Sequence, residues 1–328
     1  MADVFIDGSS GTTGLRIRER LSGRQDIRLL QLSEEKRHDV SARTEAISCA
    51  DVAFLCLPDA AAAEIAEAAR DCASVIIDTS TVHRTEEGWT YGFPELDGQR
   101  ERIASSKRIA NPGCHAGGFI ALVRPLVFYG LISEDIRLQC TSLTGYSGGG
   151  KKMIADYSDA YDNRTAASSA DGGAPRGESF GRLQAPRLYG LGGGHKHLPE
   201  MTKVCGLSRE PLFLPVVSSF YSGMEVIVQI PKEETKACGA DISAAYAEYY
   251  GRDGLVRAVD TGVAGDGDGT LSAASMRGKD TMEVSAADGK DRILLVSRFD
   301  NLGKGASGAA IQNMNIALGL DEKEGLVI

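Results

Sequence analysis

The first hundred residues alternate between short apolar runs and helix-forming segments, and this alternation constrains the fold more than any other feature of the sequence. An alanine-rich stretch of good helix propensity covers residues 60–72, and the apolar runs cover residues 4–7, 27–32, 51–57 and 75–78. Strands that alternate with helices in this way build a parallel sheet with right-handed crossovers. We therefore predict a doubly wound α/β domain at this end of the chain.

A glycine-rich turn, Gly-Ser-Ser-Gly-Thr-Thr-Gly, fills residues 8–14 between the first apolar run and a helix predicted over residues 15–21. Glycine permits a tight turn and close backbone approach, and the free N–H groups at a helix N-terminus attract a pyrophosphate. A structural loop is the alternative, because glycine-rich turns are common. We predict a Rossmann-type dinucleotide site with these cofactor contacts: Gly8, Ser10, Gly11, Thr12, Thr13 and Gly14.

The end of the second apolar run decides between the two dinucleotides, because an NAD site normally places a carboxylate there on the ribose 2′-OH. Ser33 stands at that point, and Lys36 and Arg37 follow two glutamates. A hydroxyl beside two cations suits a 2′-phosphate, so we predict NADP(H) bound by Ser33 and Arg37, with a solvated charge cluster as the alternative. Ligands also lie beyond the carboxyl ends of the other strands, which adds three predicted contacts: Leu57, Pro58 and Ser80.

Cys114 occupies a position that suits a nucleophile. Residues 108–110 are typical of a strand end, residues 111–113 form an Asn-Pro-Gly turn, and residues 115–130 are apolar enough for a buried helix. A thiol at a helix N-terminus is exposed to the helix dipole and to free N–H groups, which lower its pKa and bind an oxyanion. A small buried residue is the alternative, and it is our interpretation of four other cysteines: Cys56, Cys72, Cys140 and Cys238.

Two further polar clusters contain acid–base and anion-binding residue types. Two of the five histidines stand within residues 195–197, and a histidine can deprotonate a thiol and later protonate a leaving group. We predict His195 for this role, with a solvated basic loop as the alternative. Residues 147–152, Ser-Gly-Gly-Gly-Lys-Lys, offer N–H groups and cations to a phosphate, with a flexible linker as the alternative. The predicted substrate contacts are Ser147, Gly148, Gly149, Lys151 and, for a substrate anion, Arg84, for which a plain structural role is the alternative.

Composition excludes several classes of protein. The net charge of −9 and the pI near 5.2, without a run of Lys and Arg, argue against a nucleic-acid or anionic-membrane partner. The seven cysteines are widely spaced and contain no CxxC pair, which argues against a disulfide framework and a structural zinc site. No signal segment and no uncharged run of about 18 residues is present. We expect a soluble, cytoplasmic protein without a metal site.

Five separated motifs between Gly8 and Asn315 together resemble N-acetyl-γ-glutamyl-phosphate reductases, in the shorter of that family's two sequence types. Residues 111–119 resemble the family's nucleophile motif, and residues 195–200 resemble its His-basic-His-x-Pro-Glu signature. Residues 300–308 resemble the Asn-Leu-x-Lys-Gly-Ala-x-Gly signature of the superfamily, which includes aspartate-semialdehyde dehydrogenase. The resemblance implies three contacts near the nicotinamide: Asn301, Lys304 and Gly305.

The resemblance implies a function. It indicates NADPH-dependent reduction of N-acetyl-γ-glutamyl phosphate to the semialdehyde through a thioester on Cys114, a step of arginine biosynthesis, in a homodimer or homotetramer. His195 would be catalytic and His197 would contact the substrate carboxylate, although the two roles can be exchanged. The alternatives are the same chemistry on N-acetyl-α-aminoadipyl phosphate or aspartyl phosphate, and a non-catalytic NADP-binding redox sensor that uses Cys114 as its switch.

The remaining apolar runs predict a second, α+β domain with a mostly antiparallel sheet: residues 136–142, 212–220, 225–230 and 292–299. In relatives the last helix packs back on the cofactor domain. We therefore assign residues 1–114 with 300–328 to NADP binding, and residues 115–299 to catalysis, substrate binding and oligomerisation. The polar, glycine-rich residues 163–186 have little to bury and predict an irregular loop or lid.

Overall fold

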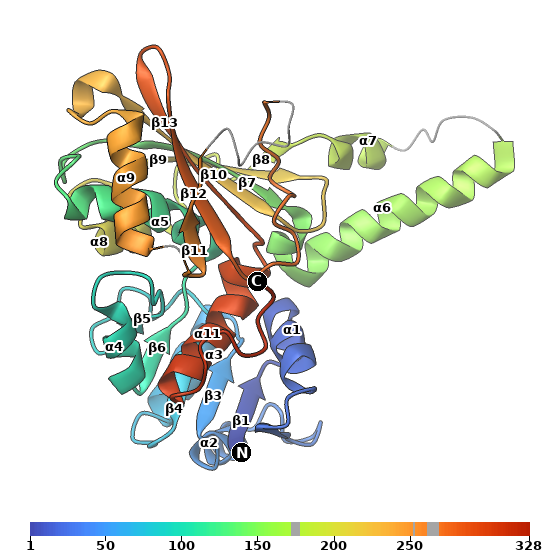
Figure 1. Ribbon diagram of the computed structural model, residues 1–328. Helices are drawn as coiled ribbons and strands as arrows, with labels where there is room; N and C mark the ends of the chain where they lie inside the picture. The colour runs from blue at the N-terminus through green and yellow to red at the C-terminus, as the bar shows by residue number, and fades with distance from the viewer. Residues whose placement is uncertain (172–177, 252, 261–268) are drawn as a thin grey trace.

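The computed structural model describes residues 1–171, 178–251, 253–260 and 269–328, with side chains described outside residues 161–180. Its lower half in Figure 1 is built on a six-stranded sheet in the order β2-β1-β3-β4-β6-β5, in which all the pairings are parallel. The strands are β1 (Ala2–Asp7), β2 (Ile27–Leu30), β3 (Val52–Leu55), β4 (Val75–Asp78), β5 (Thr90–Tyr91) and β6 (Arg108–Ala110).

Helices cover both faces of this sheet because the side chains of its strands alternate between two cores. Val4 and Ile6 enter one core with residues of three helices, and Phe5 enters the other with residues of two. The first face carries α1 (Thr12–Leu21), α4 (Gln99–Ser105) and α11 (Gly308–Ala317), and the second carries α2 (Val40–Ser48) and α3 (Asp59–Ala68). The predicted doubly wound domain is confirmed.

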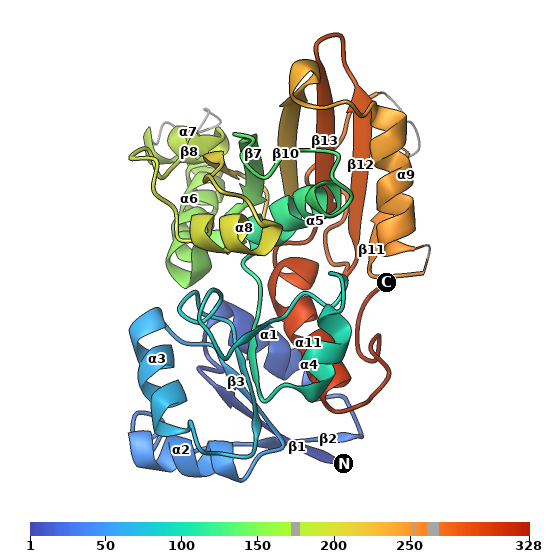
Figure 2. The ribbon, with the colours of Figure 1, turned by 90° about the vertical axis from the view of Figure 1, so that its left-hand side faces the viewer.

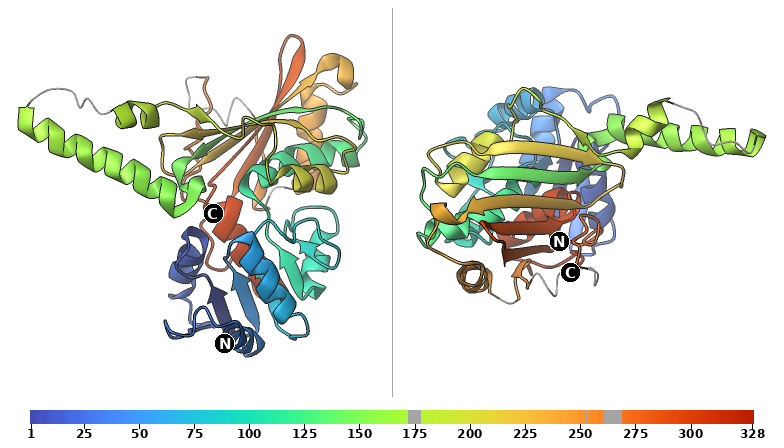
Figure 3. Two further views of the ribbon diagram at one scale, coloured as in Figure 1. Left: turned by 180° about the vertical axis from the view of Figure 1, so that it is seen from behind. Right: turned by 90° about the horizontal axis from the view of Figure 1, so that it is seen from above.

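The upper half is built on a seven-stranded sheet in the order β11-β12-β13-β10-β7-β9-β8, whose strands lie side by side in the view from above (Figure 3). Among the described strands, four pairings are antiparallel and two are parallel, so the prediction of a mostly antiparallel sheet is also confirmed. The strands are β7 (Gln139–Gly145), β8 (Arg187–Leu188), β9 (Leu212–Ser218), β10 (Met224–Pro231), β11 (Val256–Ala258), β12 (Met282–Asp288) and β13 (Arg292–Phe299).

Three helices pack against one face of this second sheet: α5 (Cys114–Phe128), α8 (Leu198–Cys205) and α9 (Gly239–Tyr250) (Figure 2). Phe213 of β9 points into that core, so its neighbours Leu212 and Leu214 point to the other face, where they are 46% and 54% exposed. The described part of this sheet therefore has one face buried by helices and one face that presents leucine to the surface.

The prediction for residues 163–186 is wrong over its described part. Helix α6 (Gly150–Asp171) extends away from the body of the molecule, and α7 (Glu178–Gln184) follows it, while residues 172–177 lie outside the described chain (Figure 1). After Gly150, the sequence of α6 contains neither glycine nor proline. Helix propensity therefore decides the local structure even where little apolar surface is available for burial.

The end of the chain returns to the first sheet. The segment η3 (Gly303–Ser307) leads into α11, whose residues Ile311 and Met314 are buried in the same core as β1 and β3. The side chain of Asn313 in α11 bonds to an earlier segment, because its Nδ2 donates to the carbonyl oxygen of Gly92 at 2.9 Å. None of the described helices is both long enough and apolar enough to cross a bilayer.

Candidate active site

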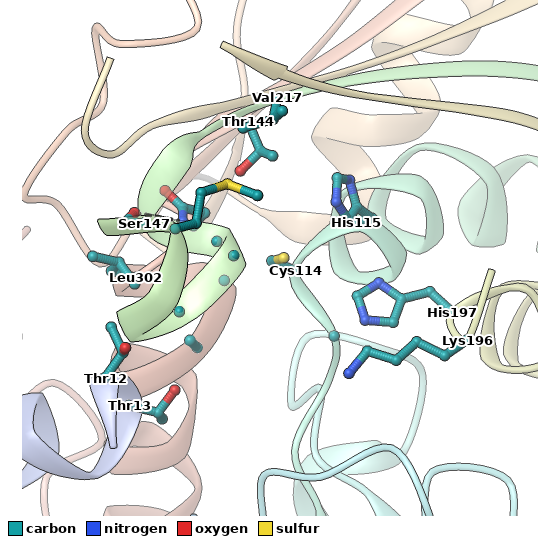
Figure 4. A pocket seen from close by; sticks show the side chains of 18 of the residues that line it. Thr12, Thr13, Cys114, His115, Thr144, Ser147, Lys196, His197, Val217 and Leu302 are labelled. Carbon is teal, nitrogen blue, oxygen red and sulfur yellow. Dashed lines mark hydrogen bonds between the residues drawn. The ribbon is translucent and has the colours of Figure 1, made fainter. Parts of the chain in front are cut away.

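Cys114 lies in a cavity of about 610 Å³ that both halves of the molecule line. It is the first residue of α5, directly after β6 and the Asn-Pro-Gly turn, and its N-cap residue Gly113 offers no side chain to the helix N–H groups. Figure 4 shows Cys114 with His115 and His197 on one side and Ser147 on the other. The predicted position of a nucleophile at a helix N-terminus is thus present, with free donors beside the sulfur.

A buried ion pair supports the turn that carries Cys114. Arg84 donates from Nη1 to Oε1 of Glu200 at 2.6 Å and from Nε to the carbonyl oxygen of Asn111 at 2.9 Å. The second oxygen of Glu200 accepts from the hydroxyl of Tyr91 at 2.8 Å and from the backbone N–H of Gly113 at 3.2 Å. Because Glu200 uses both oxygens in this network, it holds the turn and Arg84 in one fixed arrangement.

The surroundings of Cys114 oppose the low pKa that its helix position predicts. Burial raises the pKa of the Cys114 thiol above its usual value, although the Arg84 guanidinium and the backbone N–H of His115 lower it. The carboxylate of Glu200 raises the pKa further. The resting group is therefore a thiol, and its proton needs an acceptor when the sulfur attacks.

Three histidines line the cavity with Cys114, and the centroids of their rings lie 4.8–5.6 Å apart. Nδ1 of His195 accepts from the backbone N–H of His197 at 3.2 Å, so a neutral His195 carries its proton on Nε2. His197 is buried, its Nδ1 has no partner among the described residues, and burial with the nearby Arg84 charge holds its pKa well below the usual range. His197 is therefore neutral, and its Nδ1 has no partner among the described residues, whereas a neutral His195 presents an N–H.

The glycine-rich element is a short 3₁₀ helix, η1 (Tyr146–Gly149), that leads into α6. Ser147, Gly148 and Gly149 line the cavity together with Gly150, the first residue of α6. The N-terminus of a long helix therefore opens at the cavity, where its N–H groups and dipole favour an anion.

The cavity lining is cationic although the protein is acidic. Its charged side chains are Arg84, Arg182, Arg187 and Lys196, and among the described residues no Asp or Glu lines it. The whole chain has a formal net charge of −9. This contrast predicts a ligand with more than one negative charge and no cationic group.

A second cavity, of about 910 Å³, lies at the glycine turn before α1. Gly8 has φ +81°, and a Cβ there would collide with the carbonyl oxygen of Cys56, so only glycine fits this turn. Gly11 caps α1 without a side chain, which leaves the first N–H groups of the helix to a ligand. Below the turn, burial raises the pKa of Asp7, while its ion pair with Arg43 at 2.7 Å lowers it. These residues fit a dinucleotide pyrophosphate.

The predicted cofactor residues divide between the two cavities. The second cavity is lined by Gly8, Ser10, Gly11, Arg37, Leu57 and Pro58. The Cys114 cavity is lined by Thr12, Thr13, Asn301 and Gly305. Gly14, Ser33, Ser80 and Lys304 line neither cavity. Ser80 instead donates to Asp78 at 2.6 Å, and Lys304 pairs with Glu95 at 2.6 Å.

Of the predicted catalytic and substrate residues, all except Lys151 line the Cys114 cavity: Cys114, His195, His197, Ser147, Gly148, Gly149 and Arg84. Lys151 lines the second cavity, because its side chain leaves the start of α6 toward the glycine turn. His115, Tyr189 and Lys196 also line the cavity and were not predicted from the sequence, although His115 and Lys196 stand inside the motifs already quoted. Their position beside a nucleophile or a histidine was the available signal.

Comparison with known proteins agrees with this arrangement. Residues 3–106 match the family model "Semialdehyde dehydrogenase, NAD binding domain" and residues 114–301 match "Semialdehyde dehydrogenase, dimerisation domain". Among solved structures, an aspartate semialdehyde dehydrogenase from Francisella tularensis has a TM-score of 0.73 at 13% identity, with 96% of this chain and 99% of that chain covered. Aspartate semialdehyde dehydrogenase II from Vibrio cholerae has a TM-score of 0.70 at 18% identity, with 97% and 99% covered. At this identity they share the fold.

Curated relatives are much closer in sequence. An N-acetyl-γ-glutamyl-phosphate reductase of Trichormus variabilis is 42% identical over 98% of both chains. One of Chelativorans sp. is 42% identical over 97% of this chain and 98% of its own, and N-acetyl-γ-glutamyl-phosphate reductase 2 of Pseudomonas putida is 39% identical over 98% of both. The nucleophile, the histidine signature and the two cavities therefore occur in a chain that belongs to the N-acetyl-γ-glutamyl-phosphate reductase family of the semialdehyde dehydrogenases.

Proposed function

We propose that this chain catalyses the NADPH-dependent reductive dephosphorylation of N-acetyl-γ-glutamyl phosphate to N-acetylglutamate semialdehyde, a step of arginine biosynthesis. The observation that carries the proposal is the cavity around Cys114. It combines a nucleophile at a helix start, a neutral histidine with a free nitrogen and a cationic lining, next to a cavity that fits a dinucleotide. This combination matches the needs of an acyl phosphate that is first captured on sulfur and then reduced.

In the first half of the reaction the sulfur of Cys114 attacks the acyl carbon, and the bond from that carbon to the phosphate oxygen breaks. His197 accepts the thiol proton, because its Nδ1 has no partner among the described residues, and passes it to the departing phosphate, to which His195 donates a hydrogen bond from Nε2. This order exchanges the two histidine roles that the sequence suggested. The N–H groups at the start of α5 stabilise the oxyanion, and the residues 147–150 hold the phosphate.

In the second half, bound NADPH supplies a hydride to the thioester carbon. Thr12, Thr13, Asn301 and Gly305 line the same cavity as Cys114 and would hold the nicotinamide there. The carbon–sulfur bond then breaks, the aldehyde leaves, and the thiolate of Cys114 takes up a proton from solvent. Arg84 keeps its place in both halves because Glu200 binds it.

The lining also discriminates between candidate acyl phosphates. Aspartyl phosphate carries a free ammonium group, which would need a carboxylate partner in the cavity. The described lining contains four cations and no carboxylate, and Glu200 is occupied beneath the Cys114 turn. A substrate whose amino group is acylated carries only negative charge and fits this lining. N-acetyl-α-aminoadipyl phosphate, which is one methylene longer, remains the competitor to be tested.

NADP(H) is the proposed dinucleotide. The loop after β2 contributes Arg37 and His38 to the second cavity, and Arg18 and Lys151 line it as well. Glu34 also lines this cavity, but it pairs with Arg37 at 2.6 Å. The lining holds five basic side chains, Arg18, Arg37, His38, Arg43 and Lys151, against two carboxylates, Asp7 and Glu34, and this excess of basic groups favours a ribose that carries a 2′-phosphate.

The oligomer is proposed to be a homodimer or homotetramer that buries the exposed leucines of β9 against a second copy of the chain. Leu212 and Leu214 lie on the face of the sheet opposite α5, and a dimerisation-domain model matches this part of the chain.

The proposed division of the chain assigns residues 1–114 with 300–328 to dinucleotide binding and residues 115–299 to catalysis and assembly. The proposed location is the cytoplasm, supported by seven free cysteines.

Two measurements test the proposal. Rates of NADPH oxidation with N-acetyl-γ-glutamyl phosphate, N-acetyl-α-aminoadipyl phosphate and aspartyl phosphate should rank in that order by kcat/KM. Intact-mass analysis without NADPH should detect an acyl adduct on Cys114, and Cys114→Ser should lose the adduct and nearly all turnover while it still binds NADPH. Wild-type turnover in Cys114→Ser would refute the covalent mechanism.

The histidine roles have a separate test. His197→Asn should lower kcat more than His195→Asn, and the opposite order would restore the roles suggested by the sequence.

A further inference from the structure

His115, the residue directly after the nucleophile, joins two hydroxyl groups on opposite sides of its ring. Its Nδ1 lies 2.7 Å from Oγ of Ser142 on β7, and its Nε2 lies 2.7 Å from the hydroxyl oxygen of Tyr189, which follows β8. His115 and Ser142 are buried, whereas Tyr189 lines the cavity. The chain of three side chains therefore begins inside the protein and ends at the reaction cavity.

The direction of the hydrogen bonds follows from the donors available. Burial lowers the pKa of His115 to about 3, so its ring is neutral and has one N–H. Ser142 is fully buried, and among the described residues its hydroxyl has no partner except His115. A buried hydroxyl donates its proton where an acceptor is present, so Ser142 donates to Nδ1 of His115. The ring proton is then on Nε2, which donates to the oxygen of Tyr189.

This order leaves the O–H of Tyr189 without an acceptor in the described part of the chain, at a position on the cavity wall. The backbone N–H of Tyr189 donates to the carbonyl oxygen of Pro215 at 3.2 Å, which attaches the residue to β9. Burial raises the pKa of Tyr189, and a thiolate at Cys114 raises it further. Cys114 and Tyr189 line the same cavity, so an acyl group on the sulfur would enter a space whose wall carries this O–H.

We propose that Tyr189 is a further catalytic residue, whose O–H donates a hydrogen bond to the oxygen of the reacting acyl carbon, and that Ser142 and His115 are positioning residues that direct this O–H into the cavity. The oxygen becomes negatively charged when the sulfur adds and again when hydride adds to the thioester. Tyr189 keeps its proton throughout. The inference deepens the proposed function and rests on it.

The first test reads the tautomer of His115 and needs no substrate. The chain has five histidines, so a sample labelled with ¹⁵N in histidine gives few imidazole signals, and His115→Gln identifies the one that belongs to His115. The expected result is a His115 ring protonated on Nε2, with a mixture of tautomers in Ser142→Ala. A wild-type His115 protonated on Nδ1 would overturn the inference, because Tyr189 would then donate to the ring.

The second test separates catalysis from binding. Tyr189→Phe should lower kcat for N-acetyl-γ-glutamyl phosphate by about 10²-fold, the usual cost of one lost oxyanion donor, with little change in either KM. Ser142→Ala should lower kcat less, and it should have no further effect in a Tyr189→Phe background, because both act through one O–H. Tyr249→Phe is the matched control: its hydroxyl accepts from the backbone N–H of Asp97 at 3.0 Å, it does not line the cavity, and kcat should stay at the wild-type value.

The outcomes distinguish the two proposals. An inactive wild type would refute the proposed function. An active wild type whose kcat is the same in Tyr189→Phe, or in which only KM changes, would refute the role of Tyr189 and leave the proposed function intact.

Discussion

Replacing Gly113 by alanine places one methyl group among three functional side chains. A Cβ built on Gly113 lies 2.6 Å from both Oε1 of Glu200 and Nε2 of His197, and closer still to Nη1 of Arg84. The backbone of Gly113, with φ −76° and ψ 145°, is available to alanine without strain. The whole effect of the substitution therefore comes from contacts between side chains.

The size of the effect follows from those distances. Carbon atoms in ordinary contact stay about 3.5–4.0 Å from their neighbours, so each of these groups must retreat by roughly 1 Å. A displacement of ~1 Å in a catalytic arrangement costs about 10²-fold in rate, and overpacking of a filled site costs about 1–3 kcal/mol of stability. Gly113→Ala should accordingly lower kcat by about two orders of magnitude and lower the unfolding temperature.

The assay compares this variant with Gly117→Ala, one helical turn further along α5. A Cβ on Gly117 meets only Cβ of Pro112, at an ordinary 3.9 Å, so this control should keep its kcat and unfold no earlier than the wild type. Both variants should bind NADPH as the wild type does, because neither glycine lines the dinucleotide cavity. Equal kcat values for Gly113→Ala and Gly117→Ala would refute the argument that Arg84, Glu200 and His197 must stay in place.

Three further predictions follow from charges in the structure. Lys151→Ala should raise the KM for NADPH by a few-fold and leave the KM for the acyl phosphate unchanged, since Lys151 lines the dinucleotide cavity. A raised KM for the acyl phosphate with an unchanged KM for NADPH in steady-state kinetics would contradict this placement. Lowering the pH from 6.5 to 5 should cost about 2 kcal/mol of unfolding free energy through His115 alone. The pKa of His115 is about 3 in the folded chain and near 6.5 in the unfolded one, so the stability present above pH 6.5 is lost as the pH falls. Urea unfolding at both pH values should show that this contribution is missing in His115→Gln. Lys304→Met should cost about 3–5 kcal/mol, because it leaves Glu95 buried without its partner, and a denaturation midpoint equal to that of the wild type would argue against this buried pair.

The sequence predicted the fold best where apolar runs are continuous and bounded by polar residues. The predicted strands at residues 75–78 and 292–299 coincide with β4 and β13. The sequence analysis missed β12, in which Met282, Val284 and Ala286 alternate with small or polar residues. It also missed β5 and β8, which have two residues each and exist because β6 and β9 pair with them. Pairing between distant segments leaves no local pattern to read.

The candidate site shows the same limit. The position of Cys114 at a helix start could be predicted, because a turn and a helix are local features. The direction of the shift in the pKa of Cys114 could not be predicted, because burial by distant segments outweighs the effects of the helix start and the Arg84 charge. The anchoring of Arg84 by Glu200 joins residues 116 positions apart, and the contact of His115 with Tyr189 joins residues 74 apart. Such contacts exist only after the chain has folded.

The return of α11 to the first sheet also has a consequence for biosynthesis of the protein. A ribosome makes the N-terminal side first, yet one core of the parallel sheet is completed by Ile311 and Met314, which are made after every strand of both described sheets. Until then the growing polypeptide exposes the apolar surface that α11 will cover, and Cys114 lacks its neighbour Gly305. Activity therefore begins only after residues 303–317 have left the ribosome, and a chain released at a stop codon before Gly303 would be both inactive and prone to aggregate.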